Sequence, residues 1–217
     1  MKSYLSELIG TFILVFAGTS AIVVNELTGG VVTHVGIALV FGLVVSAVIY
    51  AIGDVSGAHI NPAVTIGFWA ARRFPGKQVL PYITSQISGA IIASIMVYCL
   101  FSATGRLGET IPSGSMTQSF ILEIILTFIL MLTIINVSTG AKEKGIMAGV
   151  AIGGVVALAA LFAGPISGAS MNPARSIGPA VVNGNTMTLW LYLIAPVIGS
   201  CIAIISCRCI REDGCCG

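Results

Sequence analysis

Two asparagines stand in the same local sequence and could act together on a polar solute. Asn61 and Asn172 each begin an Asn-Pro-Ala tripeptide, and the two copies lie 111 residues apart in a very apolar chain. If the side-chain oxygen of Asn61 caps a helix by accepting from a backbone N–H near Val64, its amide NH₂ is free to donate, and the same holds for Asn172. Two such donors, each backed by a helix N-terminus, would orient a water or hydroxyl oxygen and oppose a cation. The alternative is that both asparagines are only caps.

Arg175 directly follows the second tripeptide, which places it in the first turn of the same predicted helix. Its guanidinium group carries fixed hydrogen-bond donors and a permanent positive charge. At the mouth of a pore these properties would align a solute and repel cations. A purely structural arginine is the alternative.

The two histidines carry less information. His59 lies two positions before the first tripeptide, but no carboxylate or cysteine stands at metal-ligand spacing from it. A hydrogen-bonded loop residue or a pore-lining residue is therefore favoured over a proton relay or a metal ligand, and we predict neither a metal site nor a cofactor. His34 has no evident partner in the sequence and receives no role.

The elements that position these side chains are two short helices. Asparagine is a preferred N-cap, and proline suits the first helical position because its missing N–H would be unpaired there anyway. We therefore expect helices over 62–71 and 173–182, the second ending before Asn183-Gly184. Each would be about 15 Å long, half of a hydrocarbon core roughly 30 Å thick. Neither can span a membrane, but the two could meet at its midplane.

The irregular backbone before each tripeptide also has a predicted use. At membrane depth such backbone is tolerated only where it lines a cavity or is buried in protein. The two stretches would offer their carbonyl groups as a ladder of acceptors for a single file of solutes. They comprise Gly57, Ala58 and His59 in the first copy and Gly168, Ala169 and Ser170 in the second.

The rest of the chain has the composition of a membrane protein. Only 8% of its residues are charged, against about 25% in globular proteins, and a net charge of +2 gives no nucleic-acid footprint. Six spans place both termini on one side, and that side collects most of the Lys and Arg residues, so the positive-inside rule makes both termini cytoplasmic. The predicted spans cover about 4–25, 32–53, 78–103, 116–138, 145–163 and 187–208.

The chain also repeats itself beyond the tripeptides. The sequence around Glu7 matches that around Glu123, and Tyr82 with Gly89 matches Tyr192 with Gly199. Each copy has three spans, an odd number, so the copies must lie in the bilayer with opposite orientation. We predict an all-α membrane protein of six transmembrane helices and two re-entrant half-helices with an inverted internal repeat. Its single channel domain, 1–217, divides into repeat one (1–105), a loop (106–115), repeat two (116–208) and a cytoplasmic Cys-containing tail (209–217).

On these residues the chain resembles the aquaporin or major intrinsic protein family over essentially its whole length. The second box, 164–180, is most similar to the nodulin-26-like branch and its bacterial relatives. The resemblance implies a homotetramer with one pore per subunit. It also implies that Glu7 and Glu123 each accept hydrogen bonds from the re-entrant loop of their own repeat. Intramembrane carboxylates would also suit a proton-coupled transporter, although such a transporter would more naturally hold an asymmetric set near the midplane.

Carried over residue by residue, the resemblance implies a selectivity filter of Phe41, Ala160, Ala169 and Arg175. Water-selective relatives have His at the position of Ala160, and glycerol-conducting members tend to have Asp at the position of Ser176. Nodulin-like and glycerol-conducting members usually have Trp or a smaller residue at the position of Phe41. The chain departs from each pattern, which favours a wider, partly apolar opening.

These observations predict a passive channel for water and small uncharged solutes that excludes protons and ions, and not an enzyme. Glycerol-type polyols lead the candidate solutes, followed by urea and by boric, arsenious or silicic acid. A coupled secondary transporter, a strictly water-selective channel and a membrane-junction protein with a vestigial pore are the alternatives. The predicted location is a plasma or bacterial inner membrane. The physiological solute, gating and the role of Cys207, Cys209, Cys215 and Cys216 are not assigned.

Overall fold

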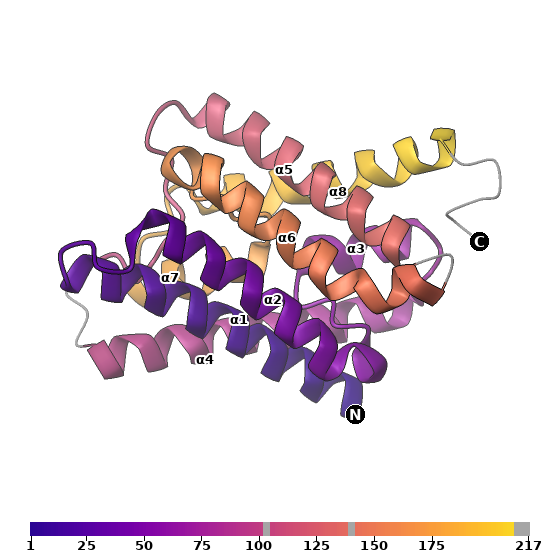
Figure 1. Cartoon of the computed structure of the whole chain (residues 1–217), viewed down its shortest axis with the longest axis horizontal. Helices are drawn as coiled ribbons and strands as arrows, with labels where there is room; N and C mark the ends of the chain where they lie inside the picture. Colours follow the sequence, from indigo (N-terminus) through magenta and orange to yellow (C-terminus); the bar gives the residue numbers. More distant parts are fainter. Residues whose placement is uncertain (102–104, 139–141, 211–217) are drawn as a thin grey trace.

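The computed structural model describes residues 1–101, 105–138 and 142–210, and every regular element in them is a helix. Six helices are long and apolar enough to cross a membrane, whereas α3 and α7 are half that length, which confirms the predicted fold class. Figure 1 shows α1 beside α4, and α2 and α6 crossing in front of the two short helices. The elements are α1 (Lys2–Leu27), α2 (Thr33–Ser56), α3 (Pro62–Ala70), α4 (Gly76–Phe101), α5 (Met116–Val137), α6 (Lys142–Ser167), α7 (Pro173–Asn183) and α8 (Leu189–Ile210).

Glycines allow the long helices to pack closely in equivalent pairs. A Cβ atom on Gly89 of α4 would overlap the backbone carbonyl of Leu8 in α1, and one on Gly199 of α8 would overlap that of Ile124 in α5. Helices in lipid associate by such close backbone approach, because burial of apolar surface drives little association there. The α1–α4 and α5–α8 pairs are thus the matching frames of the two repeats.

Helix α6 continues four residues beyond its predicted end, through Pro165 to Ser167. Proline has no N–H to donate to the carbonyl four residues earlier, which here belongs to Leu161. His34 of α2 donates from Nε2 to that carbonyl oxygen at 2.7 Å. The sequence offers no partner for His34, and the structure shows that His34 satisfies the carbonyl of Leu161 that Pro165 leaves without a donor.

The two chain ends lie toward the same end of the molecule. In Figure 1 the N-terminus and the last turn of α8 are both at the right, as an even number of spans requires. Most of the predicted tail, including Cys215 and Cys216, lies outside the described residues. Cys209 lies in the last turn of α8 and is an exposed free thiol.

Candidate functional site

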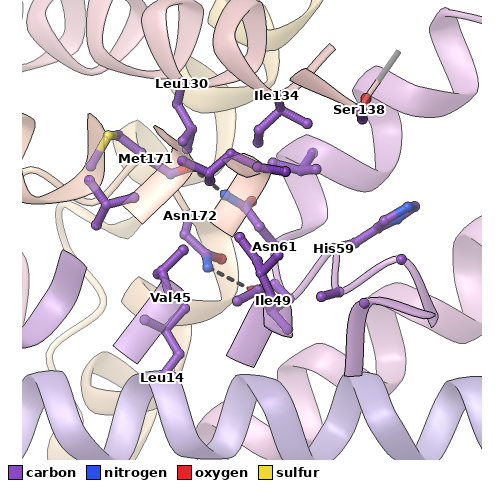
Figure 2. Close-up of a pocket in the computed structure, with 18 of the residues that line it drawn as sticks. Leu14, Val45, Ile49, His59, Asn61, Leu130, Ile134, Ser138, Met171 and Asn172 are labelled. Atoms are coloured by element: carbon purple, nitrogen blue, oxygen red, sulfur yellow. Dashed lines mark hydrogen bonds between the residues drawn. The ribbon is translucent and has the colours of Figure 1, made fainter. Parts of the chain in front are cut away.

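A cavity of about 500 Å³ passes between the two short helices and is lined by residues of both repeats. Along α2 its lining extends from Phe41 to Asp54, which corresponds to about 20 Å of helix. Arg175 and Ala160 lie with Phe41 in this lining, and Arg73 and Ser138 also contribute to it. Figure 2 shows apolar side chains of several helices around Asn61 and Asn172. The cavity is therefore elongated, with polar groups confined to a few places.

The two predicted asparagines lie together at the centre of this cavity and are bonded across it. Each caps its short helix, since Asn61 Oδ1 accepts from the N–H of Ala63 at 2.9 Å and Asn172 Oδ1 from that of Ala174 at 3.0 Å. The first cap bond is one residue closer to the asparagine than the expected N–H near Val64.

Each side-chain amide also reaches into the other repeat. Asn61 Nδ2 donates to the carbonyl of Met171 at 2.8 Å, and Asn172 Nδ2 donates to the carbonyl of Ile60 at 2.9 Å (Figure 2). An amide has two N–H donors, so one per asparagine is used in the fold and one remains for a solute. The expectation that the whole NH₂ group faces the lumen is corrected on this point.

The backbone before each cap follows the same unusual path in both copies. Gly57, Ala58 and Ile60 have positive φ angles of 82°, 46° and 44°. The equivalent Gly168, Ala169 and Met171 have φ angles of 81°, 42° and 54°. Left-handed conformations are unfavourable for residues with a Cβ atom and above all for a β-branched residue, so other contacts must hold these loops.

Two buried carboxylates supply those contacts. Glu7 accepts from the backbone N–H of His59 at 2.9 Å and of Ile60 at 2.6 Å. Glu123 accepts in the same way from Ser170 at 2.9 Å and Met171 at 2.8 Å. Both glutamates are fully buried and lie outside the cavity lining. Each therefore binds two successive N–H groups of the strained loop in its own repeat.

His59 is held in an aromatic cluster. Its ring stacks on Phe68 with centroids 4.7 Å apart and contacts the rings of Phe74 and Tyr82. Its Nδ1 is 3.2 Å from the hydroxyl of Thr65. Figure 2 shows the ring directed away from the two asparagines. Part of His59 still lines the cavity, so the structure combines the two readings that the sequence favoured.

The four residues of the predicted filter all line one cavity. The guanidinium of Arg175 lies over the ring of Phe41, 5.1 Å from its centroid, and its Nη1 donates to the carbonyl of Gly108 at 2.7 Å. Phe41 fits a notch at Gly18, where an added Cβ atom would overlap the ring. Ala160 and Ala169 add only methyl groups. Of the predicted loop residues, Gly168 alone is absent from the lining, because its Cα faces Thr110.

Most of the apolar side chains that line the cavity were not predicted from the sequence. On two helices these residues are spaced four apart, in a row that begins or ends at a predicted filter residue. This spacing is the pattern in the sequence from which they could have been predicted. The rows are Phe41, Val45, Ile49 and Gly53 on α2 and Ala148, Ile152, Val156 and Ala160 on α6. Residues four apart share a helix face, so each row extends the filter along the cavity.

Comparison with known proteins agrees with this geometry. The family model described as "Major intrinsic protein" matches residues 1–206. Aquaporin NIP3-1 of Arabidopsis thaliana is 49% identical over 208 residues, with 92% of this chain and 64% of that protein covered, so the chain spans less than two thirds of this relative. Nodulin-26 of Glycine max is 44% identical over 92% of this chain and 74% of its own length. The aquaglyceroporin structure from Plasmodium falciparum has a TM-score of 0.83 at 28% identity and covers 93% of both chains.

Proposed function

Since the chain belongs to the major intrinsic protein family, whose members are membrane channels for water and small solutes, we propose that it conducts glycerol-sized uncharged solutes as well as water and excludes ions. The observation that carries the proposal is the set of filter residues, all four of which line one cavity. Of these four residues Phe41 and Arg175 are large, and the Phe41 ring fits into the notch at Gly18. The two alanines leave room for a three-carbon polyol or a planar trihydroxide, whose hydroxyl groups meet Arg175 while its carbon edge rests on Phe41.

Ion exclusion follows from fixed donors and charges. Asn61 and Asn172 each keep one N–H for the lumen and stand at the N-terminus of a helix, which carries roughly half a positive charge. Arg175 adds a full positive charge at the constriction. A cation therefore meets a positive potential at two levels of the pore, while a neutral solute exchanges its water contacts for these donors and for the loop carbonyls.

Several further assignments belong to the same proposal. The channel is a homotetramer in a plasma or bacterial inner membrane, with both termini cytoplasmic. Glu7 and Glu123 hold the re-entrant loops in place. The likeness to Nodulin-26 and Aquaporin NIP3-1 supports urea and metalloid hydroxides such as boric acid as further solutes. Passive flux that ignores a proton gradient distinguishes the channel from a coupled transporter.

Substitution of Ala160 tests the proposal. Ala160→His places an imidazole opposite Arg175, which adds both bulk and a second polar wall. We expect glycerol flux to fall at least tenfold, a barrier increase of about 1.4 kcal/mol, while most of the water flux is retained. Stopped-flow light scattering on reconstituted vesicles measures both, with water flux in the same vesicles as the internal control. A wild type that excludes glycerol, urea and boric acid alike would be a water-selective channel.

A further inference from the structure

Residues 105–115, the described part of the loop between α4 and α5, are fixed to the body of the channel on several sides. Leu107 is buried against Val23 and Val97. The carboxylate of Glu109 accepts hydrogen bonds from the side-chain amides of Asn183 and Asn185, which lie at the end of α7. Two residues between and beside these anchors contact the helix that carries Arg175: the Gly108 carbonyl accepts from Arg175 and the Thr110 hydroxyl donates to Ser176. These contacts fix the loop, and the loop in turn holds Arg175 and Ser176 in place.

Three hydroxyl groups form a directed chain from this loop to the centre of the pore. Ser170 Oγ lies 3.0 Å from the carbonyl oxygen of Asn172, which can only accept, so Ser170 spends its hydrogen there. Ser176 Oγ, 2.6 Å from Ser170 Oγ, must then be the donor of that pair. Thr110 Oγ1 in turn donates to Ser176 at 2.7 Å. All three residues are buried, and of the three only Ser170 lines the cavity. A missing donor at Thr110 therefore leaves Ser176 without that partner, away from the lumen, which is costly for a buried hydroxyl group.

The same short segment holds both sides of the opening. The Gly108 carbonyl binds the guanidinium of Arg175, and the Thr110 hydroxyl binds Ser176, the next residue of α7. The methyl group of Thr110 also packs on Gly168, where an added Cβ atom would lie 3.0 Å from it. Gly168 precedes Ala169, the filter residue with φ of 42°. Thr110 therefore contacts both Ser176, the residue after Arg175, and Gly168, the residue before Ala169.

We propose that Thr110 is a positioning residue of the constriction, which sets the separation between Arg175 and the backbone of Ala169 through the hydroxyl chain to Ser176 and Ser170. Thr110 does not line the cavity and touches no solute. Its contribution is to select solutes by size, and the inference rests on the proposed function of the pore. Loss of the hydroxyl group releases Ser176 and, through it, Ser170, and lets the opening widen.

The test is the ratio of glycerol to water permeability in vesicles that carry Thr110→Val, which keeps the shape of the side chain and removes the donor. Both permeabilities come from the same vesicles, so the amount of folded channel cancels. We expect the ratio to rise at least threefold in Thr110→Val and in Ser176→Ala, which breaks the chain one link further in. Thr110→Ser retains the hydroxyl group and should stay closer to the wild-type ratio than Thr110→Val.

Ser113→Ala is the matched control. Ser113 belongs to the same loop and donates from its hydroxyl to the carbonyl of Ile166, but it is no part of the chain, so its ratio should equal that of the wild type. Wild-type ratios in both Thr110→Val and Ser176→Ala would overturn the inference. If the wild type itself excludes glycerol, the proposed function fails, and this inference is then decided by whether Thr110→Val admits glycerol. Should Thr110→Val not fold, Ser176→Ala decides alone.

Discussion

At the scale of single residues, the two pore asparagines divide their amides between the fold and the solute. Each donates one N–H to a carbonyl of the opposite repeat, which leaves two donors in all for the lumen. A water oxygen has two acceptor sites, so a single water molecule can receive both. A water molecule held in this way has no free acceptor site for a proton from its neighbour. We therefore expect proton transfer along the file of water to be interrupted at the two asparagines, without the need for a titratable group.

Gly18 offers a way to move the wall of the constriction without touching a pore residue. In Gly18→Ala the new methyl group overlaps the ring of Phe41, so we expect the ring to shift toward Arg175 and the glycerol-to-water permeability ratio to fall severalfold. Gly154→Ala is the control, because nothing lies within 4 Å of its added Cβ atom. An unchanged ratio in Gly18→Ala would mean that Phe41 does not set the width of the opening.

The asparagines and the paired glutamates were identifiable from sequence because the repeat places each in an equivalent setting, and Arg175 because it is a charged residue directly after the second tripeptide, where the first copy has Val64. The carbonyl groups of Ile60 and Met171 were not. A left-handed backbone is expected at glycine, and Gly57 and Gly168 meet that expectation. At Ile60 it arises only because Glu7 binds the adjoining N–H groups. Which carbonyl groups face the opposite asparagine is therefore decided by a tertiary contact that no local pattern encodes.

At the scale of elements, hydropathy and the Asn-Pro pairs located all eight helices of the described residues, and the ends differ from the expected ones by at most four residues. The second half-helix ends at Asn183, one residue beyond its expected end, and Gly184 follows it with φ of 76° as the left-handed C-cap. The passage of α6 through Pro165 depends on His34, more than a hundred residues earlier. Sequence-local reasoning ends a helix at such a proline because it cannot see the substitute donor.

The close contacts between helices make a paired prediction. Gly89→Ala and Gly199→Ala each drive a methyl group into a backbone carbonyl of the neighbouring helix, and overpacking of this kind costs about 1–3 kcal/mol. We expect both variants to lower the unfolding temperature in detergent, relative to wild type and to Gly154→Ala. A similar decrease in unfolding temperature in the two variants would indicate that the α1–α4 and α5–α8 contacts contribute equally to stability. An unchanged unfolding temperature in both would contradict the close packing.

At the scale of the whole molecule, the two repeats are equivalent in outline and different inside. A serine bonds the buried glutamate in both repeats, Ser56 with Glu7 and Ser167 with Glu123. Gln86 also donates to Glu7, whereas the corresponding position of the second repeat is Pro196, which has no side-chain donor. Thr127 bonds the carbonyl of Glu123, but the hydroxyl of the equivalent Thr11 has no partner in the described residues. The repeated sequence predicted the frame, and each half satisfies its buried carboxylate with its own set of donors.

The orientation of the molecule can be tested directly. Lys2, Arg72 and Lys77 lie at the end that also carries Arg208, and the positive-inside rule assigns this end to the cytoplasm. Epitope tags at either end of the chain should be protected from antibody in intact cells and become accessible on permeabilisation. A tag inserted at Gly30, in the turn after α1, should be accessible without it. The opposite pattern would invert the assignment.

The crossed amide bonds also impose an order on biosynthesis. The acceptor for Asn61 lies 110 residues later in the chain, which at about 5–20 residues per second is a delay of roughly 6–22 s. During that interval Asn61 lacks the acceptor that it has in the folded protein, and an amide buried without a partner costs about 1–3 kcal/mol. The first repeat therefore cannot complete the hydrogen bonds at the centre of the pore by itself. These bonds form only after the second repeat has been synthesised.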